Sequence, residues 1–367
     1  MMQPDLRGHI LKKAAVYLGI MAVFSVLLMY FIPVAEDTFA KKKEEILTAQ
    51  NREREKLLSM SGIELIDYAN DTVEDVSVKE QTLRFDLPLG CKGESVKVEH
   101  NLREEICTIS FKYADENYFL DRTVTGDTSV LSDVNYEYAD KVGTLTLRMS
   151  DMYECFTDYD EEAFYLTFKK PTEIYDKIVF IDAGNGGDDT GVEKYNIDEK
   201  NINLDICLKL KDLLKDVEDT GFYFSRLGDE TLSEEEREAY AKGVGADIII
   251  SVRMNHTPSG MLSTINGTSV SYNEVGDSTQ TIAETLKTSI IESLGTSDKG
   301  VHTLDDDDGW EDMDIPVLVI KPGFMNNTGD LEIMSTEEAR VNVANAIFSV
   351  LGDYLAGNFD ASEESQE

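Results

Sequence analysis

The chain has 367 residues, enough for two ordinary domains and a further short segment. Its 72 acidic and 34 basic side chains give a formal net charge of -38 at pH 7, which excludes nucleic acid and anionic lipid as partners recognised by charge. The four cysteines have no metal-ligand spacing, and a chain of this length does not depend on a disulfide scaffold.

An apolar run without charged residues occupies positions 14–34 and is long enough to span a bilayer. Three basic residues precede the run, so we expect a cytoplasmic tail over 1–13, a single uncleaved membrane anchor, and the bulk of the chain outside the cytoplasm. Three lysines after the run weaken this orientation signal, and a signal peptide cleaved near Ala40 is the alternative. Residues 35–60 are dense in Lys, Glu and Arg and predict a charged helical stalk.

Residues 61–171 carry runs with apolar side chains at every second position, which is typical of half-buried strands. The clearest runs are 83–89, 109–113, 145–149 and 164–168. They predict an all-β, sandwich-like domain. Its exposed polar and aromatic candidates are Asn101, Tyr113, Tyr118 and Tyr159, which we interpret as ordinary surface side chains; a glycan-binding face formed by them is the alternative interpretation.

Strands and helices alternate from residue 177 to residue 355. The predicted strands are 178–181, 221–224, 248–252, 268–272 and 315–321, and the predicted helices are 197–217, 233–243, 278–294 and 335–354. Ser233 and Glu236 form a capping box at the start of the second helix. This order predicts an α/β fold with a mixed, twisted sheet and helices on both faces. The acidic tail, 358–367, is expected to be disordered.

A glycine-rich turn follows the first strand of this second half. Gly184, Gly186 and Gly187 allow a tight turn in which the backbone can approach another group closely. Asp182 and Asn185 lie at the carboxyl end of the strand, where open α/β sheets place their ligands. The turn therefore marks the candidate site of the domain.

Five separated motifs in this half resemble, in order, those of the zinc-dependent N-acetylmuramoyl-L-alanine amidases of the third amidase family. They are IDAGNGG at 181–187, EKNINL at 199–204, SRLGD at 225–229, SVRMN at 251–255 and PVLVIKPGFMNN at 316–327. The family's patterns are IDPGHGG, EKDVNL, TRxxD, SIHAN and PAVLVELGFLSN, and Arg237 lies where the family has its ER pair. The β-rich segment resembles, more loosely, the AMIN domain, which often precedes such amidases and is thought to bind cell wall.

The resemblance implies a zinc ion held by a His, a Glu and a second His, with a further Glu as general base. In this chain the first His is Asn185, the Glu ligand is kept as Glu199, the second His is Arg253, and the base is Lys321. An amide is a poor zinc donor, and a guanidinium has no lone pair to give. A protonated lysine cannot take a proton from water. We therefore expect no zinc cofactor and no intact catalytic set.

Two further hypotheses concern these substitutions. The Arg253 guanidinium is expected to occupy the metal's place and to pair with Glu199, which leaves Lys321 to attract an anion such as a peptide carboxylate. Neutral drift, with these side chains in solvent, is the alternative. A zinc site could also be rebuilt from other side chains, for which the candidates are His256, His302, Asp188 and Asp189.

The sequence thus predicts a single-pass membrane protein whose amidase-like domain binds peptidoglycan or a cell-envelope protein rather than cleaving it. An active, divergent amidase with a relocated zinc site and a scaffold without a ligand are the alternatives. An acidic loop at 305–314 is expected to be solvated and self-repelling; Ca²⁺ binding there is the alternative, although the EF-hand spacing is missing.

Overall fold

The computed structural model describes residues 65–67, 81–119, 124–310 and 312–359. The predicted cytoplasmic tail, membrane anchor and stalk, and residues 360–367 of the predicted acidic tail, lie outside these ranges. Within the described ranges, none of the helices has both the length and the apolar character needed to cross a bilayer.

The β-rich region is built from two sheets that face each other across one apolar core. The first sheet has the order β1 (Leu65–Asp67), β5 (Val124–Gly126), β2 (Thr82–Asp86), β9 (Ala163–Lys169) and β8 (Glu154–Tyr159). The second has the order β3 (Lys97–Asn101), β4 (Ile106–Lys112), β7 (Val142–Met149) and β6 (Leu131–Ala139), with short 3₁₀ turns at η1 (Gly93–Ser95) and η2 (Thr128–Val130).

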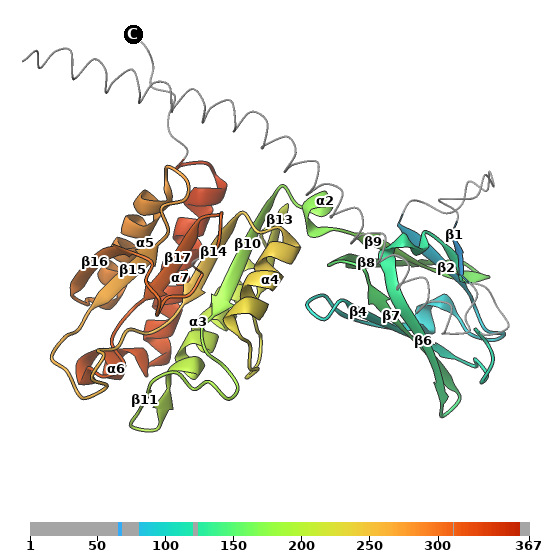
Figure 1. Cartoon of the computed structure of the whole chain (residues 1–367), viewed down its shortest axis with the longest axis horizontal. Coiled ribbons are helices and arrows are strands. Elements are labelled where there is room, and N and C mark those ends of the chain that lie inside the picture. Colours follow the sequence, from blue (N-terminus) through green and yellow to red (C-terminus); the bar gives the residue numbers. More distant parts are fainter. Residues whose placement is uncertain (1–64, 68–80, 120–123, 311, 360–367) are drawn as a thin grey trace, which may run out of the picture.

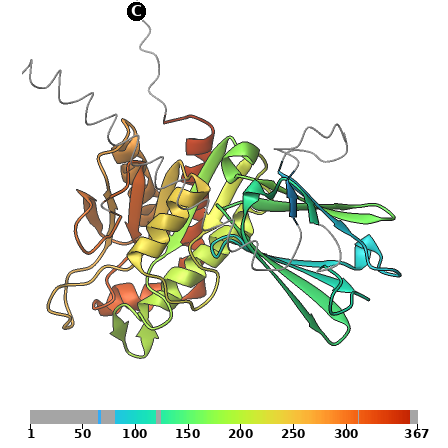
Figure 2. The same cartoon turned by 45° about the vertical axis from the view of Figure 1, so that its right-hand side comes forward.

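Burial alternates along these strands as the period of two predicts. The inward side chains of both sheets meet, and the rings of Phe85 in β2 and Phe111 in β4 lie 6.1 Å apart. Each of the four clearest apolar runs begins inside a strand of the structure. A short helix, α2 (Pro171–Ile174), then leads into the second region (Figures 1 and 2).

The α/β region is organised around a six-stranded mixed sheet. Its order is β13 (Thr220–Phe224), β10 (Lys177–Ala183), β14 (Ile248–Val252), β17 (Val317–Lys321), β15 (Thr268–Tyr272) and β16 (Asp298–Thr303). The first four strands are parallel, whereas β15 runs antiparallel to β17 and parallel to β16. The helices are α3 (Glu199–Leu214), α4 (Glu234–Val244), α5 (Thr279–Leu294), α6 (Thr328–Met334) and α7 (Glu337–Leu355).

Helices cover both faces of this sheet because successive residues of the central strands point in opposite directions. Val179 and Ile181 of β10 pack with α3, α5 and α7, whereas Ile178 and Phe180 pack with α4 and with Trp310. The expectation of a mixed sheet between two helical layers is confirmed, and Figure 1 shows the layers beside the β-rich region.

Four elements of the described α/β region were not predicted. Strand β16 is polar and only partly buried, so its sequence lacks an apolar period. The hairpin of β11 (Glu193–Lys194) and β12 (Ile197–Asp198) has two residues in each strand, too few to show a pattern. Helix α6 precedes the predicted closing helix; Asn327 caps it by accepting hydrogen bonds from the backbone N–H groups of Gly329 and Asp330.

Candidate functional site

The four residues singled out in the sequence lie around one cavity of about 350 Å³. Asn185 follows β10, Arg253 follows β14, and Lys321 is the last residue of β17, so the carboxyl ends of three parallel strands supply one side chain each. Glu199 begins α3. The topology therefore brings together residues that are up to 136 positions apart, from Asn185 to Lys321.

The glycine turn is held in a conformation that few residues tolerate. Asn185 has φ 59°, and Gly186 has φ 133°, where a Cβ would lie 2.3 Å from the backbone oxygen of Glu230. The Asn185 amide donates to Asp189 Oδ2 at 2.9 Å and accepts from Asn203 Nδ2 at 3.3 Å. Both ends of the Asn185 side chain are thus engaged with the protein.

Two buried arginines hold this turn from behind. Arg226 is 2% exposed, and its guanidinium donates at 2.9–3.0 Å to the backbone oxygens of Ala183, Gly184, Lys200 and Gly228. Arg237 donates to the backbone oxygen of Asn185 at 2.6 Å and forms an ion pair with the fully buried Asp182. The motif resemblance located both arginines, but only the structure shows that they act as supports.

The buried position of Asp182 would raise the pKa of its carboxyl group. The attraction of Arg237 and then of Arg253, with hydrogen bonds from serine hydroxyls, outweighs burial and holds this pKa below its usual value. Ser251 Oγ donates to the carboxylate at 2.7 Å. Asp182 is therefore a buried carboxylate whose oxygens are engaged by Arg237 and Ser251, so it is not available to a ligand.

Glu199 is satisfied by the backbone. Its Oε1 accepts from the Met254 N–H at 2.8 Å and its Oε2 from the Val192 N–H at 3.1 Å, and the residue is 5% exposed. Among the described residues no ion pair within 4 Å joins it to Arg253, so the predicted Arg253–Glu199 pair is wrong. Both carboxylate oxygens already have amide partners, which removes the need for a guanidinium there.

Among the described residues, Arg253 has no ion-pair or side-chain hydrogen-bond partner. Its Nε is buried without a hydrogen bond, and the cation–carboxylate pairs near it in the described part of the chain belong to Arg237 and Lys321. Its aliphatic stem passes over the glycine turn, where a Cβ on Gly184 would lie 2.7 Å from Arg253 Cγ. The guanidinium thus lines the cavity without a carboxylate within 4 Å among the described residues, and only the longer-range attraction of Asp182 acts on it.

Lys321 was expected to be free for an anion, and this is also wrong. Its Nζ lies 2.5 Å from Oδ1 of Asp308, which is fully buried; the contact is an ion pair without hydrogen-bond geometry. Asp308 belongs to the acidic loop that was predicted to be solvated. Residues 305–307 of this loop are exposed as predicted, but Asp308 and Trp310 are buried, and the Trp310 ring lies 6.0 Å from that of Phe180. Hence the loop is folded back onto the end of β17.

The residues present do not fit a zinc ion. Of the three positions at which the motif resemblance implies zinc ligands, Arg253 offers no lone pair, Asn185 uses its amide within the protein, and Glu199 already accepts two N–H groups. In the described part of the chain, no group of three or more His, Cys, Asp or Glu side chains is placed to hold a metal. Of the proposed replacement ligands, His256 lines the cavity, whereas His302 lies on β16 against the Lys299 oxygen.

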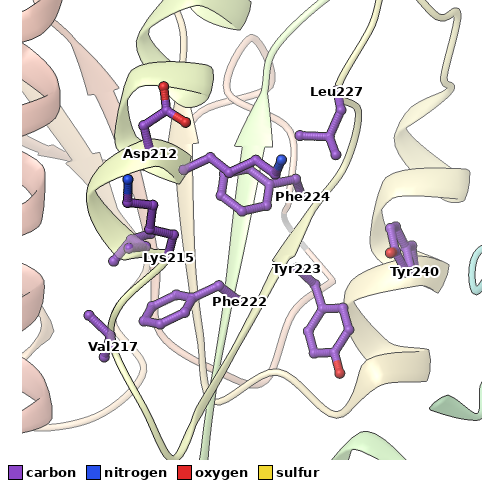
Figure 3. A pocket seen from close by; sticks show the side chains of 10 residues that line it. Asp212, Lys215, Val217, Phe222, Tyr223, Phe224, Leu227 and Tyr240 are labelled. Carbon is purple, nitrogen blue, oxygen red and sulfur yellow. The ribbon is translucent and has the colours of Figure 1, made fainter. Parts of the chain in front are cut away.

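A larger cavity, about 610 Å³, lies beside the edge strand β13 (Figure 3). Its lining is mainly apolar, with the rings of Phe222 and Phe224 and the side chains of Val217 and Leu227. It lies away from the carboxyl ends of the central strands, and its polar residues Lys211, Asp212 and Lys215 form no catalytic constellation.

The candidate glycan face of the β-rich region is not a single surface. Tyr118 is 6% exposed and packs edge-on against Phe119 at 5.0 Å, so it belongs to the core. Tyr113 and Tyr159 are exposed, as is Asn101, but Asn101 lies on β3 and Tyr159 on β8, in different sheets. The alternative interpretation of one glycan-binding face formed by all four residues is therefore wrong, whereas three of the four are exposed as the preferred interpretation expected.

Residues 179–352 match the family model described as N-acetylmuramoyl-L-alanine amidase. A Bacillus subtilis protein described as uncharacterized protein YqiI is 32% identical over 185 residues, which cover 49% of this chain and 86% of that protein. The chain belongs to the N-acetylmuramoyl-L-alanine amidase family.

Within this family, the amidase CwlM of Bacillus licheniformis is 31% identical over 158 residues, 42% of this chain and 59% of that enzyme. A solved N-acetylmuramoyl-L-alanine amidase from Clostridium difficile 630 is 26% identical, with a TM-score of 0.46; the match covers 49% of this chain and 97% of that one. The chain thus matches less than two thirds of CwlM, and the β-rich region lies outside the family match.

Proposed function

We propose that this chain is a non-catalytic member of the amidase family whose α/β domain binds peptidoglycan. The observation that supports the proposal is the set of side chains at the zinc-ligand positions that the resemblance implies: the carboxylate of Glu199, with both oxygens occupied, the engaged amide of Asn185 and the guanidinium of Arg253. Hydrolysis by the family's route needs a metal-bound water and a base that accepts its proton. The positions that the resemblance assigns to these roles supply neither, because Arg253 cannot bind a metal and Lys321 stands in the base position as the cation of an ion pair.

The choice of peptidoglycan as ligand rests on family membership, since the relatives named as amidases act on the N-acetylmuramoyl-L-alanine linkage that their names state. The proposal extends to the rest of the chain. Residues 14–34 would anchor the protein in the cell membrane in a single span, with the bulk of the chain outside, and the β-rich, AMIN-like region would add contacts with the cell wall.

The first prediction separates binding from catalysis. Purified protein is expected to sediment with insoluble peptidoglycan, to contain well below one zinc per chain by elemental analysis, and to release no stem peptide. A matched variant, Asn185→His with Arg253→His and Lys321→Glu, restores the family's ligands and base and is expected to gain zinc, which shows that the assay detects a loaded site.

Other results would contradict the proposal. Stoichiometric zinc, together with stem-peptide release that a chelator abolishes, would identify an active amidase with a relocated site. Failure to sediment with peptidoglycan would remove the proposed ligand and favour a protein partner in the envelope or a scaffold without a ligand.

A further inference from the structure

The charges around the cavity are unevenly compensated. Each carboxylate oxygen of Glu199 accepts a hydrogen bond from a backbone amide, and Lys321 is paired with Asp308. Arg253 is left as a cation with a buried, unpartnered Nε in a chain whose net charge is strongly negative. A buried donor without a partner is costly, so an acceptor that enters the cavity gains a charge-assisted hydrogen bond and relieves that cost.

Two further carboxylates line the same cavity. Asp305 and Asp307 are exposed and line the same cavity as Arg253. Their loop is tied together: the Asp305 N–H donates to Asp308 Oδ2 at 3.2 Å, and the Asp307 N–H donates to Asp305 Oδ1 at 3.1 Å. Because Asp308 is paired with Lys321, the loop is also fixed to the end of β17.

The cavity is therefore bipolar, and a simple anion does not match it. An anion that reaches Arg253 meets repulsion from Asp305 and Asp307, whereas a simple cation is repelled by Arg253. A group that carries both charges close together avoids both penalties. The volume of about 350 Å³ is at the small end for ligand sites and fits an amino-acid-sized group rather than a long saccharide.

We infer that this cavity recognises a zwitterionic amino-acid group at the end of a peptide, with its carboxylate on Arg253 and its ammonium between Asp305 and Asp307. The inference rests on the proposed function and names the part of the cell-wall peptide that binds in the cavity. The planar guanidinium can donate two parallel hydrogen bonds to one carboxylate. A lysine ammonium cannot form this bidentate contact.

Three matched peptides test the inference by titration calorimetry with the whole protein. The first ends in meso-diaminopimelate, whose side chain carries an amine and a carboxylate on one carbon. The second has lysine at that position and lacks the carboxylate, and the third has 2-aminopimelate and lacks the amine. The first peptide is expected to bind about tenfold more tightly than either of the others, the scale of one charge-assisted hydrogen bond.

Protein variants assign the two charges. Arg253→Gln and Arg253→Lys are expected to abolish the preference for diaminopimelate over lysine, and Asp305→Asn with Asp307→Asn is expected to abolish the preference over 2-aminopimelate. Asp306→Asn is the matched control, because Asp306 is exposed on the same loop but does not line this cavity.

The outcomes distinguish this inference from the proposed function. Equal affinity for all three peptides, with sedimentation on peptidoglycan retained, would overturn the inference and leave the proposed function standing. Binding of 2-aminopimelate as tightly as diaminopimelate would show a site for anions alone, which also overturns it. Loss of both peptide binding and sedimentation would overturn both.

Discussion

Asp182 and Arg237 form a charged pair that is almost fully removed from water, directly under the glycine turn. Each charge would be costly without the other, since a buried ion loses its hydration. Because the folded pKa of Asp182 lies below its usual value, its contribution to stability is present at neutral pH. That contribution is lost as the pH falls through the folded pKa.

The second prediction concerns this pair. Arg237→Met leaves the Asp182 carboxylate buried without its main counterion and is expected to lower the free energy of unfolding by about 3–5 kcal/mol, measured by urea denaturation at pH 7. The difference from the unchanged protein is expected to shrink in acid, where Asp182 is protonated in both. Lys242→Met is the control on the same helix; its exposed pair with Glu238 contributes little. Equal losses in the two variants would contradict the account.

Helix α4 begins where its sequence says it should. Ser233 Oγ accepts from the Glu236 N–H at 3.2 Å, and Glu236 Oε2 accepts from the Ser233 N–H at 2.8 Å, which completes the predicted capping box. The helix carries Arg237 and Tyr240 on its buried face. The residue at which the helix begins therefore also determines where Arg237 meets the backbone of Asn185. A local signal thereby fixes a long-range contact.

The third prediction is that Ser233→Ala lowers the free energy of unfolding by about 1 kcal/mol, since one orphan N–H of the first turn loses its acceptor. Thermal or urea unfolding measures the change. Ser297→Ala, at an exposed serine of the same domain, is the control and is expected to have almost no effect. A cost at Ser233 no larger than at Ser297 would show that water replaces the cap.

The two regions of the molecule meet at the loop that supports the glycine turn. Arg103, from the β3–β4 connection, pairs with Glu230 at 2.7 Å and donates to the Ser225 oxygen at 3.1 Å. Tyr223 donates to Glu154 of β8 at 2.9 Å, and Leu102 and Met152 join the apolar cluster under α4. The β-rich region is therefore in direct contact with the framework of the cavity.

The fourth prediction is that Arg103→Ser combined with Tyr223→Phe uncouples the two regions. Scanning calorimetry is expected to show two separated unfolding transitions in place of one, because the polar contacts across the interface are lost. Arg84→Ser removes an ion pair with Asp86 inside the β-rich region and is the control for the loss of a surface charge. A single, unshifted transition in the double variant would show that apolar packing alone joins the regions.

Much of the fold could be read from local signals. Apolar runs of period two, the capping residue of α4 and the glycine turn each act over a few neighbouring residues, so they survive without a tertiary context. The short or polar elements β11, β12 and β16 carry no such signal, and pairing with neighbours decides them. The motif positions also located the four cavity residues, since parallel strands bring their carboxyl ends to one edge.

The partners of those residues were decided only by the tertiary structure. The sequence by itself determined that a guanidinium and an ammonium stand where the motif resemblance implies a zinc ligand and a base, because aligning the motifs needs only the residue type at each position. Which carboxylate each cation meets depends on three-dimensional competition: the backbone amides of Val192 and Met254 occupy Glu199, and the folded acidic loop brings Asp308 to Lys321. For that reason Arg253 has no ion-pair partner among the described residues, because side-chain pairing follows distance and burial, which no linear pattern encodes.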